Sequence, residues 1–298
     1  MTMHLFGTAL TTQAVAANNR GENEGTVSTL QKIIRNGDIY STVSAEAIRY
    51  ALREVWLQDE DLELNRVVSH DGSEWKDKEF TKPGEYIDND VLGYMHAKKE
   101  TLSRRGILEI TRAISTTPWT GTLSHNFASP GANPMGNVDP IPYQAEIHDT
   151  RYQFSFAMTP DALLQDKRER TEKTLRAIQN LRRVAGNHAR YLFDFSPEVI
   201  VLRWTPDPAP RFLLCFDQDE RGTISLERLV SRLQGAEPDI KPDELVIGNT
   251  LGEIRALDKL KAMNVSVHTG VKAAVSEILE RVKNDRGSGA ARAAKKKK

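Results

Sequence analysis

Two stretches near the N-terminus have the clearest structural pattern in the chain: HLFGTALTTQAVAANNRGENEG (residues 4–25) and SAEAIRYALREVW (residues 44–56). Apolar and polar residues alternate over residues 3–15, which predicts a strand. Residues 44–56 predict an amphipathic helix that begins after an N-cap at Ser44. Its apolar side chains fall at the spacing of one buried stripe: Ile48, Ala51, Leu52, Val55 and Trp56. Residues 16–43 are predicted to form a long polar loop with a turn at Asn36-Gly37-Asp38.

The rest of the chain continues the alternation of strands and helices. Strands are predicted at 103–115, 151–159, 199–205 and 211–217, and a helix at 169–185. Three further helical segments, LERLVSRL, GEIRALDKLKAM and VKAAVSEILERVKN, are separated by the short strands LVIG and NVSV. The core order strand–helix–strand–strand–helix–strand predicts an α+β, RRM-like (ferredoxin-like) sandwich with a helical C-terminal extension.

We predict a single core over residues 1–285 with two insertions. Residues 59–90 hold 11 acids against four Lys and Arg, which favours an insertion with a solvated acidic surface over a metal site. Residues 113–150 contain no Lys or Arg and are dense in Gly, Pro, Asn, Ser and Thr. A loop of this length is typical of a functional arm, and Trp119 and Phe127 argue against plain disorder. The tail, 286–298, is predicted to be disordered.

The formal net charge of zero conceals an acidic body. The tail contributes six Lys and Arg and no acid, which leaves 35 basic against 41 acidic side chains. Any nucleic-acid contacts must therefore be concentrated on one surface. The chain has no apolar run of the roughly 20 residues that span a bilayer, no secretory signal, and one cysteine, Cys215, which we expect in the core. We expect a cytoplasmic protein without a membrane partner.

Known catalytic motifs are missing from the sequence. There is no P-loop, G-x-G-x-x-G, H-E-x-x-H, G-x-S-x-G or paired-cysteine motif, and the seven histidines are scattered without ligand spacing. This pattern favours a protein that is not an enzyme and that holds no cofactor or metal.

Three groups of residues are candidates for contacts with an anion. Arg49 and Arg53 lie one turn apart on the first helix, where phosphate binding and a plain surface position are equally consistent with the spacing. Asn18, Asn19 and Arg20 offer donors beside Gly21, although a surface turn is the commoner role for such a loop. Asn187, His188 and Arg190 follow the second helix, where a helix C-cap competes with an anion-binding loop.

Four blocks of the sequence resemble the CRISPR-associated backbone subunit of type I Cascade, in the DevR branch typical of type I-B systems. The blocks are GTALTTQAVAANNRGENEG, SAEAIRYALREVW, PIPYQAEIHDTRYQFSFAMTP and LRRVAGNHARYLFDFSPEVIVLR, and together they span most of residues 1–217. The resemblance implies an RRM-like palm, a finger-like insertion (59–100) and a β-hairpin thumb (117–148). It also implies copies stacked along CRISPR RNA, which present the guide for pairing with target DNA.

The same resemblance implies roles for particular residues and partners. Ser44 joins the RNA-binding candidates, which are Asn18, Asn19, Arg20, Ser44, Arg49, Arg53, Asn187, His188 and Arg190. Phe127 or Met135 would be the thumb wedge that displaces a base. Other copies of the chain, a large subunit, a small subunit and a handle-capping paralogue would complete the complex.

Two alternatives remain from the sequence. Relatives in type III complexes that cut RNA carry a catalytic aspartate between the first strand and the first helix, and Asp38 is the only aspartate there. A metal-dependent endoribonuclease that cleaves target RNA is therefore the alternative, although Asp38 suits a turn better. An RRM-like protein that binds RNA as a monomer is the other.

Overall fold

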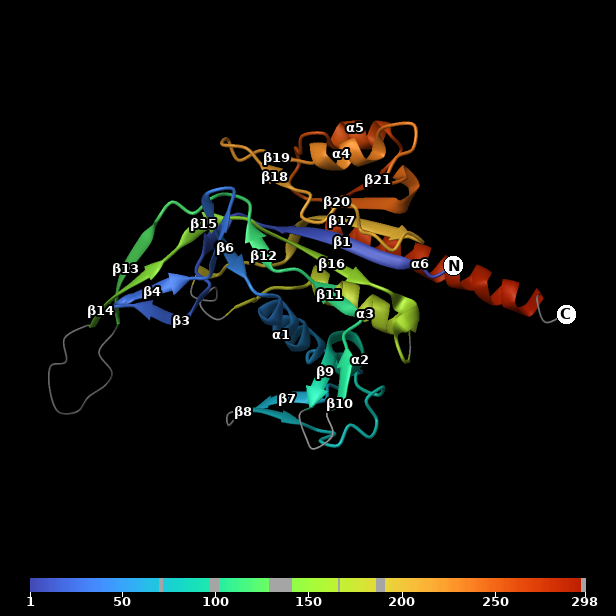
Figure 1. Ribbon diagram of the computed structural model, residues 1–298, viewed down its shortest axis with the longest axis horizontal. Helices are drawn as coiled ribbons and strands as arrows, with labels where there is room; N and C mark the ends of the chain where they lie inside the picture. Colours follow the sequence, from blue (N-terminus) through green and yellow to red (C-terminus); the bar gives the residue numbers. More distant parts are fainter. Residues whose placement is uncertain (70–71, 97–101, 129–140, 166, 186–190, 296–298) are drawn as a thin grey trace.

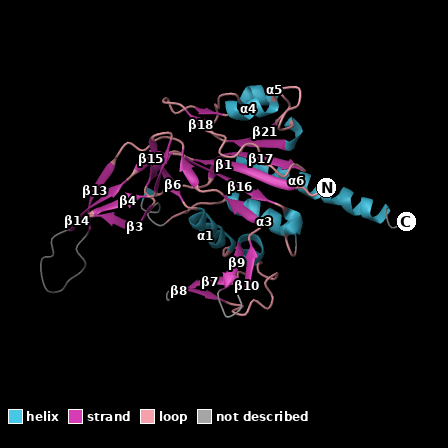
Figure 2. Cartoon of the chain, viewed as in Figure 1, coloured by secondary structure: helices cyan, strands magenta, loops and turns pink. Residues whose placement is uncertain are grey.

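The computed structural model describes residues 1–69, 72–96, 102–128, 141–165, 167–185 and 191–295. One mixed α+β body carries a large sheet, with smaller sheets extending from it at two places (Figures 1 and 2). The α+β class predicted from the sequence is confirmed.

A large sheet runs through the body in the order β21-β20-β17-β1-β16-β12-β6-β5, with β11 also paired to β16. The pairs are antiparallel except for β20 and β21, which run parallel. The strands are β1 (His4–Thr11), β5 (Lys32–Arg35), β6 (Asp38–Val43), β11 (Leu108–Ile110), β12 (Ala113–Ser115), β16 (Tyr152–Met158), β17 (Pro197–Thr205), β20 (Leu245–Asn249) and β21 (Ser266–Thr269).

Helices cover both faces of this sheet, because alternate residues of its central strands are apolar on each side. On β1, Leu5 and Ala9 join a core with α1 (Ala45–Trp56), α3 (Lys167–Gln179) and α6 (Val271–Lys295). Phe6 and Leu10 face the opposite core, which holds α4 (Glu227–Leu233) and α5 (Leu257–Ala262).

Gly7 is required where β1 pairs with β16. A Cβ atom at Gly7 would lie 2.2 Å from the Phe156 ring, directly across the pair. The absence of a side chain therefore lets the Phe156 ring lie over β1 in the first core.

A four-stranded sheet extends away from the large one, in the order β13-β14-β4-β3 (Figure 1). Its strands are β3 (Asn19–Glu24), β4 (Val27–Leu30), β13 (Leu123–Ala128) and β14 (Ile141–Glu146). The prediction of a long loop over residues 16–43 is therefore wrong. Pairing with the arm supplies these polar strands with backbone partners that local sequence does not reveal. The turn at Asn36-Gly37 is confirmed, with φ angles of 54° and 91°.

The base of this four-stranded sheet is fixed by Glu146. Its buried carboxylate accepts hydrogen bonds from the Leu30 amide at 2.6 Å and from Lys32 Nζ at 2.7 Å. Lys32 also lies 4.3 Å from the centroid of the Trp119 ring. The arm is thus tied to the N-terminal strands, while the division of residues 117–148 into a separate thumb stays a prediction.

The insertion after α1 forms two hairpins joined by a short helix. They are β7 (Arg66–Ser69) with β8 (Gly72–Trp75), α2 (Ile87–Leu92), and β9 (Gly93–His96) with β10 (Leu102–Arg105). The prediction of a solvated acidic surface for this insertion is wrong for two of its carboxylates, because Asp88 and Asp90 are buried. The Asp90 carboxylate accepts a hydrogen bond from Arg170 of α3 and another, at 2.9 Å, from Arg104. The contact with Arg170 anchors the insertion to the core.

Three local predictions differ from the structure. The strand expected at 103–115 is divided into β10, β11 and β12, because Gly106 packs its Cα against the backbone of Leu92. Residues 211–216 are irregular, not a strand: Arg211 and Leu214 have positive φ. The Leu214 amide instead donates to Ser155 Oγ at 2.8 Å. The tail expected to be disordered continues α6 as far as Lys295, in line with the high helix propensity of alanine, lysine and arginine.

Six further short elements lie among the described residues. They are the pairs β2 (Ala14–Ala16) with β15 (His148–Thr150) and β18 (Asp217–Gln218) with β19 (Ile224–Ser225), and the 3-10 turns η1 (Pro160–Ala162) and η3 (Pro242–Glu244). Cys215 is buried, as expected. Within the described residues, no helix is long and apolar enough to cross a membrane.

Candidate nucleic-acid interface

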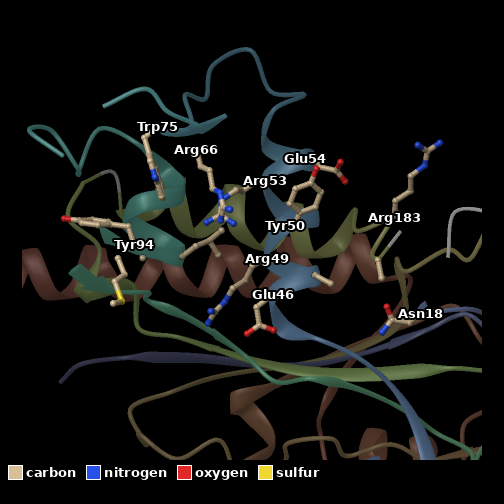
Figure 3. Close-up of a pocket in the computed structure, with 15 residues that line it drawn as sticks. Asn18, Glu46, Arg49, Tyr50, Arg53, Glu54, Arg66, Trp75, Tyr94 and Arg183 are labelled. Atoms are coloured by element: carbon tan, nitrogen blue, oxygen red, sulfur yellow. The ribbon is translucent and has the colours of Figure 1, made fainter. Parts of the chain in front are cut away.

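A groove of about 880 Å³ lies between α1, the inserted hairpins and the segment after α3 (Figure 3). Its lining is rich in arginine and aromatic side chains. The lining residues are Asn18, Glu46, Ala47, Arg49, Tyr50, Arg53, Glu54, Arg66, Trp75, Leu92, Gly93, Tyr94, Met95, Arg183 and Ala185.

Helix α1 forms one wall of the groove because its amphipathic pattern fixes which side is buried. Ile48, Ala51, Leu52 and Trp56 pack into the core, as the spacing predicted. Arg49 and Arg53 consequently project from the other side of the helix. The N-cap at Ser44 is confirmed: its oxygen accepts from the Ala47 amide at 3.2 Å. Ser44 is buried, so the cap is the role that the structure gives it.

Arg49 is a cation of the groove for which the described residues supply no partner. Its Nε is buried and has no hydrogen-bond partner, and the guanidinium forms no ion pair within the described part of the chain. The pairing with Glu46 that would make Arg49 a plain surface residue is absent from these described contacts. A guanidinium offers five N–H donors in a planar fork that matches phosphate. Arg49 is therefore available to an external anion.

Arg53 differs from Arg49 because it has a protein partner. Its Nε lies 3.7 Å from the buried carboxylate of Asp88, and its side chain is 14% exposed. Burial lowers the pKa of Arg53, Asp88 opposes this shift, and the nearby cations Arg66 and Arg49 add to it. Figure 3 shows the ends of the Arg53 and Arg66 side chains directed toward each other. Positive charge is thus concentrated in the groove, and Arg53 also connects α1 to the insertion.

Aromatic rings from the insertion form the wall opposite α1. Arg66 lies 5.9 Å from the Trp75 ring centroid, and Trp75 packs on Phe80, which stacks on Tyr94 at 4.3 Å. Tyr50 of α1 adds a ring that is 45% exposed. Flat rings beside guanidinium groups suit single-stranded nucleic acid, whose bases stack while its phosphates pair with arginine. Sequence reasoning missed this wall because the acidic composition of residues 59–90 obscured its aromatic residues.

The other predicted contacts are dispersed. Asn18 lines the groove but is buried, and its Nδ2 donates to the carbonyl of Thr42 and to Gln31 Oε1 at 3.3 Å. Asn19 and Arg20 begin β3, where Asn19 pairs with Leu30. Asn187, His188 and Arg190 lie outside the described residues. Arg183, in the segment after α3, lines the groove instead, and Figure 3 places it at the opposite end from Trp75.

The two wedge candidates have different outcomes. Phe127 is on β13, opposite Pro142, and its side chain is 72% exposed. Met135 lies outside the described residues. An exposed phenylalanine on an extended strand has the shape that a wedge between bases requires.

Asp38, the aspartate of the nuclease alternative, begins β6 directly after the Asn36-Gly37 turn and is exposed. Ser44 lies six positions further along the chain, after the end of this strand, which amounts to about 20 Å. No group of three His, Cys, Asp or Glu side chains in the described residues is arranged to hold a metal ion.

Comparison with solved structures identifies the fold. The fold is that of chains in CRISPR RNA-guided surveillance complexes. One such chain matches with a TM-score of 0.61 at 15% identity, covering 94% of this chain and 99% of that one. A chain of a surveillance complex described as pre-nicking matches with a TM-score of 0.60 at 12% identity, covering 93% and 99%.

Sequence comparison identifies the family. The family model described as "CRISPR-associated negative auto-regulator DevR/Csa2" matches residues 8–219. A Myxococcus xanthus (strain DK1622) protein described as "CRISPR-associated protein Cas7/Cst2/DevR" is 38% identical over 301 residues, covering 95% of this chain and 98% of that protein. The chain belongs to the DevR/Csa2 family of CRISPR-associated proteins, which confirms the resemblance found from the sequence.

Proposed function

We propose that this protein is a non-catalytic, CRISPR RNA-binding backbone subunit of a type I Cascade complex, of the type I-B branch. Copies would assemble along the guide and present it for pairing with target DNA. Family membership supports the proposal, as does the shared fold with chains of RNA-guided surveillance complexes. The observation that carries it is the groove in which Arg49 lacks a protein partner and faces an aromatic wall.

The sheet topology supports an RRM-like palm within this proposal. The core strands β17, β1, β16 and β12 are neighbours in that order. Numbered along the chain as the four strands of the motif, they follow the order 4-1-3-2, with α1 and α3 packed on one face. This is the arrangement of a ferredoxin-like sandwich, so the groove would lie at the edge of the palm.

The groove would hold the RNA backbone through its arginines and the bases through its rings. Arg49 would bind one phosphate and Arg183, at the other end, another. Trp75, Tyr94 and Tyr50 offer faces for stacking. Arg53 and Arg66, which line the same groove, would add long-range attraction for the RNA phosphates. Local clustering of this kind reconciles RNA binding with the acidic body of the chain.

The four-stranded sheet would act as the thumb. Residues 113–150 contain no Lys or Arg, so this arm would contact RNA by shape, with Phe127 as wedge. The thumb of one copy would close over the RNA in the groove of its neighbour. Because β3 and β4 belong to the same sheet, the thumb would include N-terminal residues as well as the arm. A large subunit, a small subunit and a handle-capping paralogue would complete a cytoplasmic assembly.

Co-expression with a CRISPR array tests the proposal. The purified protein should carry RNA of one discrete spacer-containing length and should elute as a multimer that dissociates after RNase treatment. Arg49→Gln should reduce the RNA recovered per protein, whereas Arg228→Gln, on α4 across the sheet, should not. A monomer with or without RNA would refute assembly along a guide, and full RNA occupancy in Arg49→Gln would refute the groove.

The endoribonuclease alternative has a separate test. The RNA-loaded assembly is incubated with matched target RNA and Mg²⁺. The proposal expects intact target, whereas cleavage at regular intervals that Asp38→Ala abolishes would overturn it. The exposed position of Asp38 beside a hairpin turn supports the non-catalytic role.

A further inference from the structure

A second hollow, of about 620 Å³, lies away from the inserted hairpins and is not part of the groove. It is bounded by the end of α3, the start of β17 and the first turn of α6. Thr250 and Thr269 mark the carboxyl ends of the parallel neighbours β20 and β21. Ligands of α/β proteins commonly bind outside the carboxyl ends of parallel strands.

The first turn of α6 forms the floor of this hollow. Gly270 has a φ of 114°, and a Cβ atom placed there would meet nothing within 4 Å, so the space above it is open. The first turn contains no acidic side chain that could cap its amides. Free amides and the positive end of a helix of 25 residues favour an anion at this position.

Gln179 supplies a second, independent indication of a ligand. It lines the hollow, is only 8% exposed, and its Oε1 is buried without a hydrogen-bond partner. Its Nε2 makes a single long contact, 3.3 Å, to Asn180 Oδ1. The oxygen and nitrogen of such an amide are exchangeable by a flip, so the unmatched atom can accept or donate. Buried polar atoms are rarely left without a partner, so this amide has hydrogen-bonding capacity that is available to a bound group.

The charges around the hollow are predominantly positive. Arg182 and Lys272 both line it and are exposed, and neither forms an ion pair with another described residue. Asp194 is the only acid among the described lining residues, and its carboxylate already accepts from the Ser196 amide at 2.9 Å. Two free cations and a helix N-terminus therefore outweigh one carboxylate.

We propose that this hollow is a second anion site, which binds the phosphate of a nucleotide on the α6 amides, Arg182 and Lys272. Gln179 pairs with a polar group of the same ligand. The phosphate comes either from a free mononucleotide or from a nucleic-acid strand. The site does not depend on the proposed RNA groove, since Arg183, the next residue, lines that groove and not this hollow.

The test is isothermal titration of the RNA-free full chain with 5′-AMP, inorganic phosphate and a 12-nucleotide oligoribonucleotide at low salt. The double variant Arg182→Gln/Lys272→Gln should weaken AMP and phosphate binding at least about tenfold, because it removes two charge-assisted contacts. Arg228→Gln, which removes an exposed arginine of α4 on the other side of the sheet, is the control and should leave both unchanged. Gln179→Met, which removes the polar group at similar volume, should weaken AMP more than inorganic phosphate.

The oligonucleotide distinguishes the two sources. Competition with AMP that the double variant abolishes assigns the phosphate to a nucleic-acid strand; AMP binding without competition assigns it to a free nucleotide. Two results overturn the site. One is the absence of AMP and phosphate binding by the wild-type chain at millimolar concentration, and the other is an equal loss in Arg228→Gln and the double variant. Failure of Arg49→Gln to alter guide RNA binding would refute the groove and leave this site intact.

Discussion

The Arg49→Gln variant should lose guide RNA affinity without losing stability. The wild-type guanidinium has a buried Nε without a partner and no ion pair within the described contacts, so the fold gains little from it. Its removal should change the free energy of unfolding by less than about 0.5 kcal/mol. One charge-assisted contact to a phosphate contributes about 1.5–3 kcal/mol, which corresponds to a loss in affinity of about 10- to 150-fold.

Fluorescence anisotropy with a labelled guide RNA, repeated at several salt concentrations, measures this effect. If Arg49 binds one phosphate, the slope of log K against log salt should become shallower by about 0.7, the contribution of one contact to a single strand. Arg228→Gln, in which an exposed arginine of α4 loses its ion pair with Asp217, is the control and should behave like the wild type. An unchanged slope and affinity in Arg49→Gln would refute the assignment of Arg49 as a phosphate ligand.

Three further predictions concern the surroundings of the groove and the arm. Arg53→Met should reduce the free energy of unfolding by about 1–3 kcal/mol in urea titrations, because it leaves the buried carboxylate of Asp88 without its cation; unaltered stability would show that the pair is dispensable. Burial lowers the pKa of His148 to about 4, below its unfolded value of 6.5, so the unfolded chain binds more protons between these values. Stability should therefore be complete above pH 6.5 and decline as the pH falls toward 4, and thermal melts should show less of this decline in His148→Gln. Phe127→Ala should leave the melting temperature unchanged, since the ring is 72% exposed, but should reduce the fluorescence of 2-aminopurine at the displaced guide positions; unaltered fluorescence would assign the wedge elsewhere.

The sequence predicts those parts of the fold in which local pattern and burial agree. The alternation in β1 and β16 and the apolar stripe of α1 are such cases, because each element packs one face, or both, against a continuous core. The Ser44 cap and the Asn36-Gly37 turn depend only on neighbouring residues. Arg49 could be selected as a candidate for the same reason, since the stripe fixes which side of α1 faces away from the core.

Features that depend on distant partners could not be predicted. The polar strand β3, NRGENE, has no strand pattern and exists because β4 pairs with it. Phe212, Cys215 and Phe216 are buried, as in a core strand, but side chains of β16 accept hydrogen bonds from the backbone amides of Leu214 and Phe216 in place of a strand. The role of Arg53 depends on Asp88, which is 35 positions away and whose acidic neighbours suggested exposure. The aromatic wall likewise becomes visible only when the insertion folds back toward α1.

Ultraviolet crosslinking of the RNA-loaded protein, followed by mass spectrometry of the attached peptides, shows which residues contact the guide RNA. Aromatic side chains in contact with bases crosslink efficiently, so we expect nucleotide adducts on the groove residues Tyr50, Trp75 and Tyr94. The Arg49→Gln variant should show fewer of these adducts at equal protein concentration. Adducts confined to residues outside the groove, with none on these three rings, would contradict the assignment of this groove as the RNA-binding surface.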